Sequence, residues 1–68
     1  MIIELNGRSV ELRAGATVAD AVIEAGGDGD SRGIAVAVDG EVVRRVDWEQ
    51  TELRSDQTVE VVRAVQGG

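Results

Sequence analysis

The stretch IIELNGRSVEL, residues 2–12, opens the chain with two apolar segments on either side of an Asn-Gly pair. Asn6 and Gly7 both tolerate positive φ, and such a pair between alternating apolar segments is a strong signal for a β-hairpin. We therefore predict one strand at residues 2–5 and a second at residues 10–12. The chain is therefore predicted to begin with a β-hairpin.

A short helix is predicted directly after the hairpin. Thr17 is a candidate N-cap, and Asp20 stands three residues later, at the spacing of a capping box with Asp in place of Glu. Apolar residues recur at helical spacing on one face, namely Val18, Ala21, Val22 and Ala25. This pattern predicts a helix over residues 18–25, which the Gly26-Gly27 pair ends.

Three more strands are predicted in the second half of the chain. The run IAVAV at residues 34–38 is apolar on both faces, which is typical of a central strand. An Asp-Gly turn then leads into a strand at residues 41–44. Residues 47–50 are predicted to form one helical turn that presents Trp48, and residues 59–65 form the last strand.

The order strand, strand, helix, strand, strand, strand is that of an α+β domain of the β-grasp (ubiquitin-like) type. We predict a mixed sheet of four to five strands, with the first and last strands parallel at its centre. One main helix packs on one face through Val18 and Val22, and Trp48 closes a core that is otherwise aliphatic. The domain covers residues 1–65, and residues 66–68 form a flexible tail that ends in Gly-Gly.

Composition restricts the chemistry that the chain can perform. The net charge of −6 argues against nucleic acid and anionic membrane surfaces as partners. The sequence contains no His, Cys or Lys, so it lacks an imidazole base, a thiolate and a Schiff-base amine. No stretch resembles a membrane span or a signal peptide, so a cytoplasmic location is expected. We expect a carrier or binding protein rather than an enzyme, with no metal site.

The tail Gln66-Gly67-Gly68 is the candidate functional site. Two glycines have no side chains and wide conformational freedom, so the tail could thread into the active site of a partner. Its α-carboxylate is ionised near neutral pH and is a poor electrophile until ATP converts it to a mixed anhydride with AMP. Because the chain has no His, Cys or Lys, and only carboxylates, hydroxyls, Arg and the two termini remain, Gly68 is the expected site of covalent modification.

Two other features are predicted to be solvated surface. Residues 28–33, DGDSRG, have the acidic spacing of a calcium loop, but Arg32 at the fifth place and Asp39 at the twelfth do not fit it. The pair Arg44-Arg45 is predicted to be an exposed strand end. We expect partners to dock on an exposed apolar face of the sheet near the tail.

Segments spread along the whole chain carry a family resemblance: IELNG at 3–7, AGATVAD at 14–20, RGIAVAV at 32–38, GEVV at 40–43, Trp48, and VEVVRAVQGG at 59–68. Together they resemble the ThiS family, the sulfur carriers of thiamine biosynthesis. The sequence departs from the family pattern at Asp39, where Asn is usual, at Arg44, where Pro is common, and at Asp56, where a turn Gly is expected. We expect these changes to have only a local cost.

The resemblance implies a reaction cycle centred on Gly68. A ubiquitin-activating-type adenylyltransferase (ThiF-like) would use ATP to form an acyl-adenylate, and a persulfide donor would then supply sulfur. The resulting thiocarboxylate would give its sulfur to a thiazole synthase (ThiG-like). The carrier itself would bind no cofactor, because ATP is used by the partner enzyme.

The sequence is also compatible with three other functions. The small subunit of molybdopterin synthase has the same fold and thiocarboxylate chemistry, but delivers sulfur to a pterin precursor. A ubiquitin-like modifier would instead join Gly68 to a target lysine. A non-carrier β-grasp interaction module would not use its tail at all.

Overall fold

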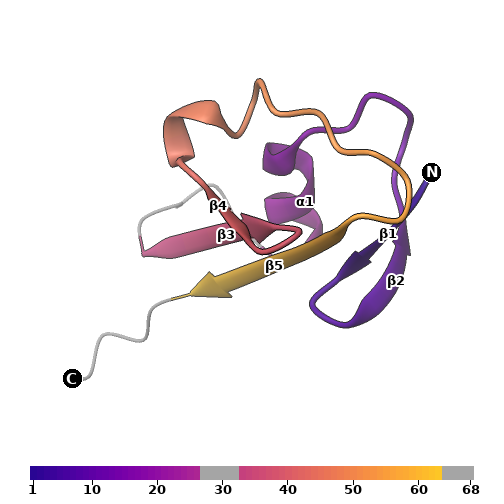
Figure 1. The fold of residues 1–68 in the computed structure, drawn as a ribbon, viewed down its shortest axis with the longest axis horizontal. Helices are drawn as coiled ribbons and strands as arrows, with labels where there is room; N and C mark the ends of the chain where they lie inside the picture. Colours follow the sequence, from indigo (N-terminus) through magenta and orange to yellow (C-terminus); the bar gives the residue numbers. More distant parts are fainter. Residues whose placement is uncertain (27–32, 64–68) are drawn as a thin grey trace.

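The computed structural model describes residues 1–26 and 33–63, which form a sheet with a helix against one face (Figure 1). In chain order the elements are β1 (Ile2–Leu5), β2 (Arg8–Glu11), α1 (Val18–Glu24), β3 (Ile34–Val38), β4 (Glu41–Val43), the 3₁₀ turn η1 (Arg45–Asp47) and β5 (Thr58–Arg63). The predicted element order is confirmed for this part of the chain.

The sheet has five strands in the order β2-β1-β5-β3-β4. β5 lies at the centre, parallel to β1 and antiparallel to β3. This confirms the predicted parallel pairing of the first and last strands. β3 is also an interior strand, as its apolar run predicted, although only one of its two faces is covered.

The opening hairpin is tighter than predicted. Asn6 and Gly7 have φ values of 51° and 81°, so both turn residues are in the left-handed region. Pairing continues up to this two-residue turn, with Leu5 opposite Arg8. β2 therefore begins at Arg8 and ends at Glu11, and the prediction of residues 10–12 was wrong at both ends.

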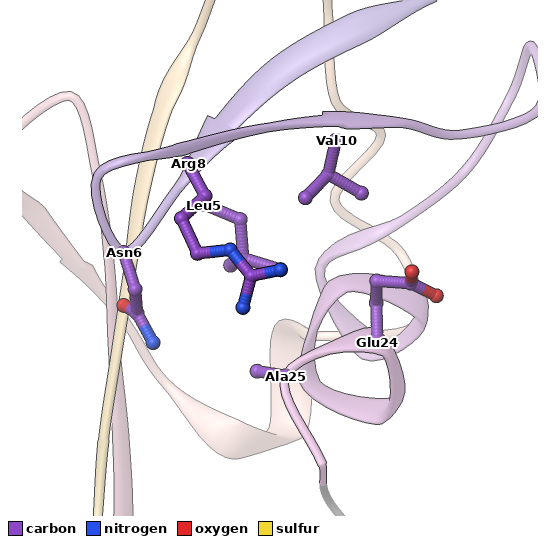
Figure 2. Close-up of a pocket in the computed structure, with 6 residues that line it drawn as sticks. All are labelled: Leu5, Asn6, Arg8, Val10, Glu24 and Ala25. Carbon is purple, nitrogen blue, oxygen red and sulfur yellow. The ribbon is translucent and has the colours of Figure 1, made fainter.

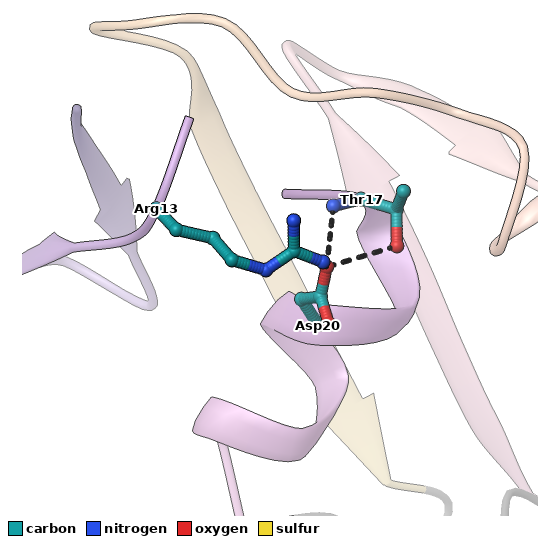
Figure 3. A network of polar contacts seen from close by, with 3 residues as sticks. All are labelled: Arg13, Thr17 and Asp20. Carbon is teal, nitrogen blue, oxygen red and sulfur yellow. Dashed lines mark hydrogen bonds and ion pairs between the residues drawn. The ribbon is translucent and has the colours of Figure 1, made fainter. Parts of the chain in front are cut away.

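Helix α1 begins after Thr17, as predicted, and ends at Glu24, one residue before the predicted end. The Asp20 carboxylate accepts hydrogen bonds from the Thr17 backbone N–H at 2.8 Å and the Thr17 hydroxyl at 3.3 Å (Figure 3). Arg13 also pairs with this oxygen at 3.0 Å. A carboxylate in the first turn satisfies a free N–H group and suits the helix dipole.

The core lies between α1 and the sheet face that the helix covers. Its buried members are Ile3, Leu5, Val18, Ala21, Val22, Val36, Trp48, Leu53 and Val59. Trp48 is 5% exposed, and its indole N–H donates to the carbonyl of Val43 at 2.9 Å. The structure therefore confirms that Trp48 is a packing residue. The helical turn predicted at residues 47–50 begins at Arg45 instead. The backbone N–H of Trp48 donates a hydrogen bond to the carbonyl of Arg45.

The three departures from the family pattern fit their local backbone. Asp39 and Asp56 have φ values of 50° and 70°, in the region that Asn and Gly also enter. The Asp39 carboxylate accepts hydrogen bonds from the backbone N–H of Thr58 at 2.9 Å and the side chain of Gln57 at 3.2 Å. Arg44 has φ of −66°, the value that proline would fix at this position.

Candidate functional site

The predicted site is the C-terminal tail, and the structure defines the strand that carries it. β5 ends at Arg63, at one end of the sheet (Figure 1). Residues 64–68, and with them Gln66, Gly67 and Gly68, lie outside the described residues, so their assignment as the functional site stays a prediction. The last two residues of the predicted strand at 59–65 also lie outside the described residues.

β5 is paired with β3 along most of its length and with β1 only at its start. On the β3 side the pairing runs from Val38 opposite Val59 to Ile34 opposite Arg63. On the β1 side it covers only Thr58 and Val59, because β1 ends at Leu5. Val59 has no exposed surface, which anchors the strand in the core.

Asn6 extends the support of β5 beyond the end of β1. Its side-chain oxygen accepts the Val61 N–H at 2.8 Å, and its side-chain nitrogen donates to the Val61 carbonyl at 3.2 Å. The side-chain amide of Asn6 thus makes the two hydrogen bonds that the backbone of a further β1 residue would make. Its partner, Val61, lies two residues before the end of β5. Sequence reasoning identified Asn6 only as a turn residue, and no local signal pointed to a partner 55 residues away.

We expect Asn6→Ala to lower the free energy of unfolding by about 2 to 4 kcal/mol. Two hydrogen bonds of about 0.5–1.5 kcal/mol each are lost, and alanine is disfavoured at the positive φ of this turn by about 1 kcal/mol. Urea unfolding followed by Trp48 fluorescence measures the change. Amide exchange at Val61 should also become faster.

Asn6→Gly separates the two contributions, because glycine keeps the positive φ and lacks the side chain. This variant should retain the turn but show the same loss of protection at Val61. If the Val61 amide exchanges at the wild-type rate in Asn6→Gly, the side chain does not support β5.

The sheet face opposite α1, here called the outer face, carries exposed apolar residues near the end of β5. Alternation along the strands places an apolar patch there, made of Ala35, Ala37, Val42 and Val62. Val42 is 76% exposed and Val62 is 60% exposed. Glu4, Glu11 and Glu60 lie on the same face. The structure therefore contains an exposed apolar sheet surface beside the end of β5, where docking was expected.

The pockets formed by described residues are small for a substrate. Three shallow pockets have volumes of about 160, 310 and 170 Å³, at or below the low end of the ~300–1,000 Å³ range of ligand sites. In the first, Arg8 extends from β2 across from Glu24 on α1, with Leu5, Asn6, Val10 and Ala25 completing the wall (Figure 2). The third pocket brings the hydroxyls of Ser9 and Thr58 near the carboxylates of Glu4 and Asp56, but among these described residues no hydrogen bond joins a hydroxyl to a carboxylate.

The remaining features that the sequence singled out take no part in a described site. Arg44 and Arg45 are both exposed, as predicted for a solvated strand end. Of the calcium-like loop, residues 28–32 lie outside the described residues, and residues 1–26 and 33–63 contain no cluster of three potential metal-ligating side chains. Over the same two ranges, no helix has the length and apolar character required to span a bilayer.

Comparison with known proteins gives one family match and one structural match of note. The model of the ThiS family matches residues 2–68. No curated protein sequence matches the chain. The crystal structure of the thiamine biosynthesis protein ThiS from Geobacter metallireducens is 20% identical, covers 100% of both chains and superposes with a TM-score of 0.74. At this identity the superposition shows the fold, and it confirms the predicted β-grasp architecture.

Proposed function

The chain belongs to the ThiS family, and on that premise we propose that Gly68 is adenylated, converted to a thiocarboxylate and used to supply sulfur for the thiazole ring of thiamine. The family match identifies the chain as a sulfur carrier of thiamine biosynthesis. The observation that carries the finer proposal is the extent of this match, which includes the terminal residue. The composition supports it, because no Cys, His or Lys offers another place for the sulfur.

The proposed chemistry has three covalent steps at the carboxyl group of Gly68, of which the second takes place at its carbonyl carbon. First, a carboxylate oxygen attacks the α-phosphorus of ATP on an adenylating enzyme of the ubiquitin-activating type, and pyrophosphate leaves. Next, the terminal sulfur of a donor persulfide attacks the acyl carbon and AMP leaves. A thiol then reduces the resulting acyl disulfide, which leaves the thiocarboxylate on Gly68 and a disulfide on the donor.

The described part of the chain contributes binding and positioning to this cycle. β5 is fixed at the sheet centre by β1, β3 and Asn6, so the strand that leads toward the tail is paired up to Arg63, its last residue. We propose that ATP, the metal it requires and the sulfur donor are all held by partner proteins in the cytoplasm. The carrier then binds no cofactor of its own.

Delivery to a thiazole synthase is tested against the molybdopterin alternative with two acceptors. The chain, thiocarboxylated at Gly68, is mixed in parallel with a thiazole synthase and its substrates, and with a large molybdopterin-synthase subunit and its pterin precursor. We expect the thiocarboxylate to be consumed in the first reaction, with formation of the thiazole product. Consumption only in the second reaction would assign the chain to the other pathway.

A further inference from the structure

β5 loses one of its two neighbouring strands before it ends. On the β1 side the last backbone hydrogen bond runs from the Asn6 N–H to the Val59 carbonyl at 2.9 Å, and the chain then turns at Asn6 and Gly7. On the β3 side the pairing continues to Arg63. Beyond Val59, the Asn6 side chain therefore takes the place of a β1 backbone beside β5, through its two hydrogen bonds to Val61.

Asn6 combines two properties that this position requires. Its φ of 51° is one that asparagine tolerates better than most residues other than glycine. Its amide also carries an acceptor and a donor side by side, as a strand backbone does. Oδ1 accepts the Val61 N–H at 2.8 Å and Nδ2 donates to the Val61 carbonyl at 3.2 Å. Glycine would keep the turn without these bonds, and aspartate would place an oxygen against the Val61 carbonyl.

A second turn residue supports the opposite end of β5 in a similar way. Asp39 is the first residue of the Asp39-Gly40 turn, as Asn6 is of the first turn, and its φ is 50°. Its carboxylate accepts the N–H of Thr58, the first residue of β5, at 2.9 Å. Two hairpin turns thus hold the two ends of one strand through a side chain, and only the end held by Asn6 leads to the tail.

The end of β5 matters for the reaction because Gly68 lies five residues beyond Arg63, at most about 18 Å when fully extended. If the strand frayed back to Val61, residues 62 and 63 would also have to be ordered each time Gly68 reached a reacting group. Ordering the backbone costs conformational entropy, and a longer flexible segment lowers the share of correctly placed ends. A smaller fraction of the bound carriers would then be ready to react.

We propose that Asn6 is a positioning residue for the reaction at Gly68, because its amide keeps the last residues of β5 in the sheet while Gly68 reacts. Asn6 acts through Val61 and not by contact with the reacting group. This inference rests on the proposed function. It assigns to a turn of the opening hairpin an effect on the rate at the other end of the chain.

Amide exchange tests the structural half of the proposal without any partner. Val62 lies opposite Ala35, and its N–H points to β3 because backbone groups alternate sides along a strand, so its own bond does not involve Asn6. After correction for global stability from urea unfolding, we expect exchange at Val62 to be severalfold faster in Asn6→Gly but unchanged in Asp39→Gly. Unchanged exchange in Asn6→Gly would overturn the proposal.

Pyrophosphate release by the adenylating enzyme, with ATP and varied carrier, tests the functional half. We expect Asn6→Gly to lower kcat about tenfold with KM nearly unchanged, because misplacement of a reacting group slows the chemical step. Asp39→Gly is the matched control, since it removes the corresponding side chain at the other end of β5, and it should keep a kcat close to that of the wild type. Urea unfolding verifies that both variants are folded at the assay temperature. Equal kcat values for the two variants would contradict a special role of Asn6.

Asn6→Asp shows whether the amide must make both bonds. Aspartate also tolerates positive φ, and when ionised it can accept the Val61 N–H but repels the Val61 carbonyl. We expect its kcat to be as low as that of Asn6→Gly, and a wild-type value would overturn the proposal. If the wild-type carrier itself releases no pyrophosphate with active enzyme, the proposed function fails, and with it the role of Asn6 in the reaction.

Discussion

Trp48→Ala should lower the free energy of unfolding by about 3 to 5 kcal/mol, the usual cost of removing a buried aromatic ring. Trp48 is 5% exposed and is the only aromatic residue of the chain. A domain of this size is expected to have only ~3–10 kcal/mol of stability, so the variant should be partly unfolded at room temperature. Each kcal/mol corresponds to about 4 to 8 °C in Tm, which predicts a decrease of at least ~12 °C in a thermal melt followed by circular dichroism.

Two further variants show which part of the Trp48 side chain matters. Trp48→Phe keeps a ring but removes the indole N–H that donates to Val43 at 2.9 Å, so we expect an intermediate loss of ~1–3 kcal/mol. Val46→Ala changes a neighbouring side chain that is 68% exposed and should cost less than about 0.5 kcal/mol. A Trp48→Ala variant as stable as Val46→Ala would show that the ring does not complete the core.

Removal of Gly68 should abolish sulfur loading. The truncated chain still ends in a glycine carboxylate, but this carboxylate lies one residue, about 3.3 to 3.6 Å, closer to the folded domain. A displacement of about 1 Å can reduce the rate of an enzymatic step by ~100-fold, so we expect a decrease of at least this size. The rate of AMP formation with the adenylating enzyme, ATP and a sulfur source measures the effect.

Gly68→Ala is the matched control for this truncation, because it keeps the chain length and the terminal carboxylate and adds one methyl group. We expect it to react more slowly than the wild type but faster than the truncated chain. If the truncated chain forms AMP at the wild-type rate, the position of the terminal carboxylate does not matter. That result would contradict a reaction that requires the carboxylate at a fixed distance from the sheet.

Much of the fold follows from local signals in the sequence. The Asn6-Gly7 turn, the Thr17–Asp20 capping box and the apolar run at 34–38 each depend on neighbouring residues, and each appears in the structure where it was predicted. The errors lie at element ends. β2 begins two residues earlier than predicted because the strand pairing extends up to the tight Asn6-Gly7 turn. η1 begins at Arg45, two residues earlier than predicted, because hydrogen bonding from i to i−3 starts before Trp48.

The features around the tail depend on contacts that are distant in the sequence. The bonds from Asn6 to Val61 exist only because β1 and β5 are brought together by the whole fold. The run Val61-Val62 is apolar on both faces, so the sequence does not determine which valine faces the helix. Once α1 covers one face, Val61 packs against the core and Val62 is left 60% exposed, one residue before β5 ends.

The central claim, that Gly68 carries the sulfur, is tested most directly by the mass of the intact chain. The wild-type protein is incubated with ATP, its adenylating enzyme and a persulfide donor, and fragmentation then locates any added mass. We predict a gain equal to one sulfur in place of one oxygen, confined to Gly68 and absent when ATP is omitted. An unchanged mass with active enzyme, or added sulfur at any other residue, would contradict the account.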